Sequence, residues 1–66
     1  MPTELLKEFI NKECIISLTN EKKDQIRGTI LATESYWVKI KEEDSNRIIN
    51  GLMIRDIKII ASNSNL

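Results

Sequence analysis

The stretch Gln25-Ile26-Arg27-Gly28-Thr29-Ile30-Leu31-Ala32 decides the fold class of this 66-residue chain. Apolar or small residues alternate with the others along it, which is the period of a β-strand with one buried face. Gly28 interrupts the middle of this strand. Because a glycine has no Cβ, it lets a strand bend sharply, as a very small barrel requires of its longest strands. The competing interpretation is that Gly28 is only a weak point in an ordinary strand.

The same alternation, with polar turns between the segments, predicts further strands on both sides of this one. The five predicted strands cover residues 14–20, 25–33, 36–42, 47–54 and 57–60. In the central strand, the alternation puts Ala32 on the same face as Ile26 and Ile30. The last residues, 61–66, are rich in Ser and Asn and are expected to be flexible.

A helix is predicted before the strands, over residues 3–12, with Thr3 as its candidate N-cap. Its apolar stripe at helical spacing consists of Leu5, Leu6, Phe9 and Ile10. One helix followed by five short strands predicts a mainly β fold in a single domain over 1–66. We expect a small five-stranded antiparallel barrel, or SH3-like roll.

The length of the chain indicates that this barrel needs a partner. Domains of this size bury only about 60% of their unfolded surface and are usually stabilised by disulfides, metals or subunits. Cys14 is the single cysteine and the chain has no histidine, so neither an intramolecular disulfide nor a zinc site is expected. We therefore expect association with further copies of the chain.

Charge and hydropathy exclude several classes of protein. No apolar run approaches the roughly 20 residues that cross a bilayer, and Glu4, Lys7 and Glu8 interrupt any signal peptide. With one free cysteine, this predicts a cytoplasmic protein with no membrane partner. The formal net charge of zero argues against a surface that binds phosphate everywhere. The basic residues of 21–27 are interleaved with acids, which indicates a solvated hairpin.

The side chains do not make a catalytic set. Without histidine, nucleophilic or general-base chemistry would have to use Cys14, lysines or carboxylates. Cys14 lies on the same side of its strand as Ile16, which favours a small core side chain over a nucleophile. The run 42–44 of three acids would bind a metal only with ligands from elsewhere, and a solvated loop is the simpler interpretation. We expect no enzyme, no cofactor and no metal site.

The order of these motifs resembles the Sm-like (LSm) superfamily, and most closely its bacterial Hfq branch. Gln25-Ile26-Arg27-Gly28 matches the start of the first Sm signature, and Ser35-Tyr36-Trp37-Val38 falls at the polar-aromatic pair of the family. Met53-Ile54-Arg55-Asp56-Ile57 falls at the second signature. This chain departs from the pattern where Asp56 replaces a glycine and Ile54-Arg55 replaces a Lys-His pair. The resemblance covers roughly residues 3–60.

The resemblance implies a homo-oligomeric ring of six or seven subunits, closed by pairing of the fourth strand with the fifth strand of the next subunit. It also implies short single-stranded RNA near a central pore. A base would stack on Tyr36, Ser35 would hydrogen-bond a base edge, and Arg55 would contact a phosphate or a base. Two other interpretations stay open: that Tyr36 begins the core face of Val38 and Ile40, and that Arg55 pairs with an acid.

Trp37, the single tryptophan, alternates to the side opposite Tyr36, on the outer surface or beneath the helix. Exposed tryptophans often mark interfaces, so a subunit or helix contact is favoured over a nucleic-acid platform. The predicted interface residues are Trp37, Ile48, Ile49, Met53, Ile57 and Ile59. The alternative to RNA binding is an oligomeric structural or protein-interaction module with the same fold.

Overall fold

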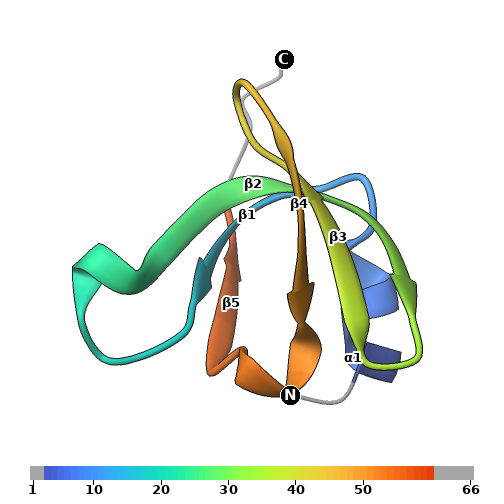
Figure 1. Cartoon of the computed structure of the whole chain (residues 1–66), viewed down its shortest axis with the longest axis horizontal. Coiled ribbons are helices and arrows are strands. Elements are labelled where there is room, and N and C mark those ends of the chain that lie inside the picture. The colour runs from blue at the N-terminus through green and yellow to red at the C-terminus, as the bar shows by residue number, and fades with distance from the viewer. Residues whose placement is uncertain (1–2, 61–66) are drawn as a thin grey trace.

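The computed structural model describes residues 3–60. They form one five-stranded antiparallel sheet with a short helix, α1 (Thr3–Leu6), at its start (Figure 1). The strands are β1 (Glu13–Ser17), β2 (Gln25–Glu34), β3 (Trp37–Lys41), β4 (Asn46–Asn50) and β5 (Asp56–Ile59). The prediction of a mainly β fold with one N-terminal helix is confirmed. The predicted flexible tail, 61–66, lies outside the described residues.

The strands lie in the order β4-β3-β2-β1-β5, so β4 and β5 are the two edges of the sheet. The longest strand, β2, arches across the molecule in Figure 1. Its first half pairs with β1 and its second half with β3, and Thr29 has a partner in both, Glu13 and Lys41. The bend of β2 therefore joins the two halves of the sheet.

Gly28 stands at this junction, next to Thr29. A Cβ at Gly28 would lie 2.7 Å from Cγ2 of Ile40 and 2.7 Å from the backbone oxygen of Lys41. No described glycine has a positive φ, so the backbone conformation is not what requires glycine here. Glycine is required at position 28 because β3 approaches β2 closely there. At a position that was merely a weak point in a strand, a Cβ would meet no such obstacle.

The core consists of side chains that alternate along the first three strands, with one residue from α1 and one from the chain before β5. The buried apolar residues are Leu6, Cys14, Ile16, Ile26, Ile30, Val38, Ile40 and Ile54. Cys14 is fully buried among them, and its thiol donates to the backbone oxygen of Lys12 at 3.3 Å. Burial raises the pKa of the Cys14 thiol. Cys14 is thus a core side chain.

The predicted alternation of β2 fails at one residue. The register between β2 and β3 shifts between Ile30 and Ala32, where a β-bulge adds one residue to β2. Ala32 consequently pairs with Lys39 and is exposed, while Thr33 pairs with the buried Val38. The placement of Ala32 in the core was wrong because a bulge exchanges the two faces of a strand.

The helix is much shorter than the predicted 3–12. After α1 the chain tightens into a 3-10 turn, Lys7–Phe9, and Asn11 takes a left-handed conformation with φ 71°. The amide of Asn11 donates to the backbone oxygen of Ile30 at 2.7 Å, so pairing with the sheet ends the helix. A helix this short is marginal without tertiary contacts, and only Leu6 of the predicted stripe is buried, whereas Leu5 is exposed.

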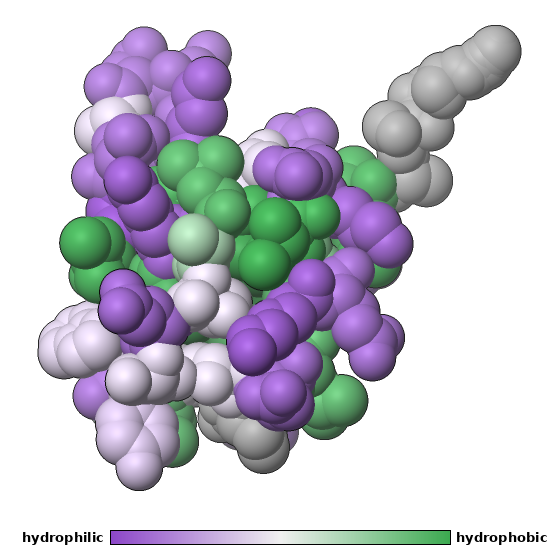
Figure 2. Space-filling model, turned by 90° about the vertical axis from the view of Figure 1, so that its right-hand side faces the viewer, coloured by the Kyte–Doolittle hydropathy of each residue, from purple (hydrophilic) through white to green (hydrophobic). Residues whose placement is uncertain are grey.

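Figure 2 looks onto the side of the molecule that carries α1 and the turn between β2 and β3 in Figure 1. Apolar side chains gather at the centre of this side and hydrophilic ones surround them.

No helix within residues 3–60 is long and apolar enough to span a membrane.

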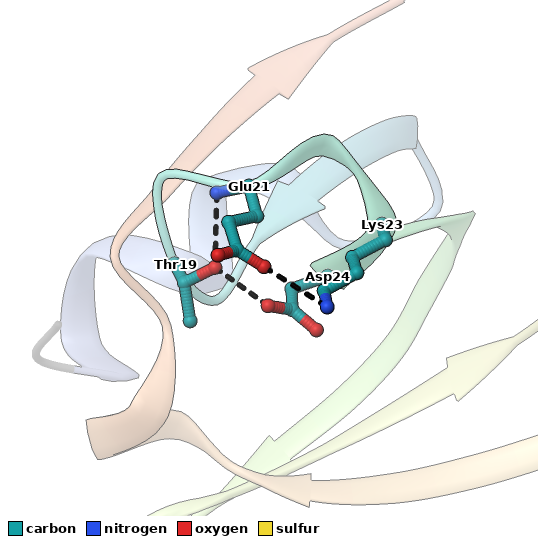
Figure 3. Close-up of polar contacts among 4 residues, drawn as sticks. All are labelled: Thr19, Glu21, Lys23 and Asp24. Atoms are coloured by element: carbon teal, nitrogen blue, oxygen red, sulfur yellow. Dashed lines mark hydrogen bonds and ion pairs between the residues drawn. The ribbon is translucent and has the colours of Figure 1, made fainter.

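The connection between β1 and β2 begins after Ser17, not after residue 20, and carries a 3-10 turn, Lys22–Asp24. Its polar groups bond to one another (Figure 3). The Thr19 hydroxyl donates to Asp24 at 2.7 Å and accepts from the amide of Glu21 at 3.0 Å. Lys23 lies 3.3 Å from a carboxylate oxygen of Glu21. This loop is a self-contained polar hairpin, as its mixed charges indicate.

Candidate functional site

Two turns that are distant in sequence meet at one end of the sheet. Ser35 and Tyr36 form the turn between β2 and β3, and a 3-10 turn, Gly51–Met53, follows β4. The backbone amide of Gly51 donates to the backbone oxygen of Tyr36. A Cβ at Gly51 would lie 3.0 Å from that oxygen and 2.8 Å from Cγ2 of Thr3, so the two turns are in close contact. We call Ser35, Tyr36, Leu52 and Met53 the turn surface.

The N-terminal helix fixes this end of the sheet as well. The hydroxyl of Thr3 donates to the backbone oxygen of Ser35 at 2.6 Å, so Thr3 bridges to the turn instead of capping its own helix. Ser35 has φ 54°, a left-handed conformation that is uncommon for a residue with a Cβ. The backbone that carries Tyr36 is therefore held from two sides, by Thr3 and by Gly51.

The side chains of the turn surface are largely exposed. Tyr36 is 61% exposed and Met53 65%, and Leu52 is similarly open to solvent. The interpretation of Tyr36 as the start of the core face is wrong, because Tyr36 precedes β3 in the turn while Val38 and Ile40 are buried. Three large side chains thus present apolar surface at one end of the fold, an arrangement that suits the face of a planar ring.

Arg55 lies apart from this network of contacts. Its backbone amide donates to the backbone oxygen of Ser17 at 2.8 Å, which ties it to the end of β1, and its side chain is exposed. Within residues 3–60 its guanidinium has no ion pair, so the pairing with an acid that the sequence left open does not occur there. The described hydrogen bonds join Tyr36 to Gly51 and Ser35 to Thr3, whereas that of Arg55 goes to Ser17.

Sequence reasoning missed Leu52 as a residue of the turn, and it missed the bond from Thr3 to Ser35. The fourth strand was predicted over 47–54, but β4 ends at Asn50, whose side chain accepts from the amide of Leu52 at 2.9 Å. The dipeptide Asn50-Gly51 is a turn signal that could have found this end. No local signal indicates that Thr3 bonds to a residue 32 positions later.

The predicted interface residues fall on different surfaces. Trp37 and Ile48 are exposed on the outer face of the sheet, since Trp37 alternates with Val38 and Ile48 pairs with Lys39. The others lie at the edges or in a turn: Ile49 on the inner face of β4, Ile57 and Ile59 on the inner face of β5, and Met53 on the turn surface.

Several cations are neutralised by neighbouring acids. Nε of Arg27 lies 3.2 Å from Glu13, and Nε of Arg47 lies 2.9 Å from Glu42, an ion pair without hydrogen-bond alignment. An open depression of about 630 Å³ includes Arg27 and Glu42 in its lining, away from the turn surface. Within the described part of the chain, no three side chains of His, Cys, Asp or Glu converge as metal ligands.

Comparison with protein-family models, with curated proteins and with solved structures finds no match to this chain.

Proposed function

We propose that this protein is an Sm-like small barrel that associates into a ring and binds short single-stranded RNA at the turn surface. The observation that carries the RNA-binding part is Tyr36, an exposed aromatic side chain on a turn that Thr3 and Gly51 hold in place. A base that stacks on such a ring gains about 1–3 kcal/mol with little dependence on its identity. Because the turn is already fixed, little conformational entropy is lost when a base binds.

The two edges of the sheet support the proposal that this protein forms a ring. In residues 3–60, β4 pairs only with β3 and β5 only with β1, so each has one side open for pairing with another strand. Ile59 on β5 is 44% exposed although it pairs with the fully buried Cys14. Antiparallel pairing of β4 with β5 of a second copy would bury this side chain and satisfy both edges. A domain this small has reason to associate in this way.

The chemistry of the turn surface predicts how RNA binds there. Exposed apolar side chains predominate, and Arg55 is the cation nearest in sequence. Stacking should therefore supply most of the affinity, with a modest contribution from phosphate contacts. Ser35, also exposed on the turn, has a hydroxyl that can bond to a base edge.

The test combines a mass measurement with RNA titrations. Light scattering gives the number of subunits, and fluorescence anisotropy gives the affinity for labelled U-rich and A-rich hexanucleotides at two salt concentrations. Tyr36→Ala should weaken binding by about 5-fold to 150-fold, which corresponds to the loss of about 1–3 kcal/mol of stacking. Tyr36→Phe is the matched control, because it keeps the ring and should bind within about 2-fold of the parent.

Two results would contradict the proposal in different ways. A folded monomer at micromolar concentration would contradict the ring. A stable oligomer that ignores RNA at low salt would contradict RNA binding and favour the alternative, an oligomeric structural or protein-interaction module. The zero net charge and the ion pairs of Arg27 and Arg47 are the observations on the side of that alternative.

A further inference from the structure

We infer that the outer face of β3 is a second contact surface for single-stranded RNA, separate from the turn surface. Its residues are Trp37, Lys39 and Lys41, which we call the outer β3 row. Trp37 would stack on a base and the two lysines would bind phosphates. This inference rests on the proposed function for the class of ligand, and it adds a site that the turn surface does not include.

The outer β3 row lies on one face by the geometry of the strand. Along β3, exposed residues alternate with the buried Val38 and Ile40, so all three row residues point away from the core. Trp37 remains 52% exposed, which rules out burial beneath α1. An exposed tryptophan on a sheet surface often marks a contact site. A sheet surface that carries an aromatic side chain can serve as a platform for unstacked bases.

The row residues follow one another at a regular spacing. Alternate residues of a strand are separated by about 7 Å. This distance is comparable with the separation of successive phosphates in an extended single strand of nucleic acid. A strand lying along β3 with a base on Trp37 could therefore place one phosphate near each lysine.

The charges of the two lysines are available for a ligand. Within residues 3–60, neither Lys39 nor Lys41 takes part in an ion pair. Four acids lie around the row. Glu13 and Glu42 form ion pairs with arginines. Glu43 has no ion pair within residues 3–60, and Glu34 lies across from Trp37. The two ends of the row differ, and Lys39 is the lysine farther from the acidic loop after β3.

The neighbouring strand favours nucleic acid over an acidic protein segment as the occupant. On the outer face of β4, Ile48 lies opposite Lys39 and Asn46 lies opposite Lys41. This face of β3 and β4 carries the ring of Trp37, two lysines, an aliphatic side chain and the amides of Asn46 and Asn50, while on the other side of β3 Glu34 of β2 lies across from Trp37. An amide next to a lysine can bond to a base edge while the lysine binds the phosphate. Pairing at the edge of β4 in a ring would leave the face open.

Trp37 makes the test direct, because it is the only tryptophan in the sequence. Excitation at a wavelength that tyrosine does not absorb reports on this side chain alone. We would titrate the full chain with a dodecameric oligo-U and follow Trp37 emission and the anisotropy of labelled RNA together. The inference predicts quenching of Trp37 that saturates with binding and persists in Tyr36→Ala.

Charge variants test the lysines. The double variant Lys39→Glu/Lys41→Glu should flatten the dependence of log affinity on log salt by about 1.4, since each phosphate contact with a single strand contributes about 0.7. Its control is Lys12→Glu/Lys22→Glu, which makes the same change of charge at two exposed lysines outside the row. Trp37→Ala should weaken binding by about 5-fold to 150-fold and Trp37→Phe should restore most of it.

The outcomes separate this inference from the proposed function. If RNA binds and Tyr36→Ala weakens it while Trp37 emission stays constant, the outer β3 row is not a site and the turn surface stands. If log affinity depends on log salt with the same slope in the two double variants, Lys39 and Lys41 do not bind phosphates and the inference is wrong. If no RNA binds, both proposals fail. Quenching by an acidic polypeptide but not by RNA would assign this face to a protein partner and overturn the inference.

Discussion

Replacing Gly28 with alanine should destabilise the fold by an amount that the structure allows one to estimate. The new Cβ would lie 2.7 Å from Cγ2 of Ile40 and 2.7 Å from the backbone oxygen of Lys41. Ile40 is fully buried and the second obstacle belongs to the backbone of β3, so neither can rotate away. Overpacking of this kind costs about 1–3 kcal/mol. The reduced entropy of the unfolded chain returns about 0.4–1 kcal/mol, so the net loss is at most about 2.6 kcal/mol, and about 1–2 kcal/mol towards the middle of both ranges.

The assay is thermal unfolding of parent and variant at one fixed protein concentration, because association of subunits would make Tm depend on concentration. For a domain of this size, the loss corresponds to a Tm lower by roughly 5–15 °C. Ile40→Leu supplies a matched background, since leucine has no Cγ2. In that background Gly28→Ala should cost less, with the contact to the Lys41 oxygen accounting for what is left.

A Tm for Gly28→Ala equal to or above that of the parent would refute the steric account of this glycine. If Gly28→Ala costs the same in the parent and in the Ile40→Leu background, Cγ2 of Ile40 is not the obstacle. The backbone oxygen of Lys41 would then account for the whole effect.

Three further predictions concern the core and the support of the turn surface. Thr3→Val should lower the free energy of unfolding by about 0.5–1.5 kcal/mol, because it removes the bond to Ser35, whereas Thr3→Ser keeps the hydroxyl and most of the stability; chemical denaturation distinguishes them. Ile16→Ala should cost about 2–5 kcal/mol in the same assay, since Ile16 is fully buried, and a cost under about 1 kcal/mol would contradict its place in the core. Burial raises the pKa of Cys14 above its ordinary 9.0, so its contribution to stability is complete below that pH and is lost as pH rises through the folded-state pKa. Relative to Cys14→Ala, the parent should therefore lose stability above about pH 9, and parallel stability curves would contradict this.

The candidate site could be predicted only in part. The polar-aromatic pair Ser35-Tyr36 was found from the order of motifs, and it lies on an exposed turn. Its neighbours were not found, because the amide of Gly51 and the hydroxyl of Thr3 reach it across 15 and 32 residues of sequence. Arg55 was predicted beside Tyr36 from a motif, but its described bond is to β1. Such contacts depend on how strands are arranged, and no local pattern records that arrangement.

The sequence by itself determined the mainly β fold and the core positions of Ile16, Ile26, Ile30, Val38 and Ile40, because a strand with one buried face must repeat its apolar side chains every second residue. Only the tertiary structure decided the short helix, the exposure of Ala32 and the meeting of the two turns. Pairing with Ile30 ends the helix, and a bulge that arises only when β2 pairs with β3 exchanges the faces of β2. Gly28 depends on both the sequence and the tertiary structure. Its place in the strand was visible in the sequence, while the atoms that require a glycine there come from β3.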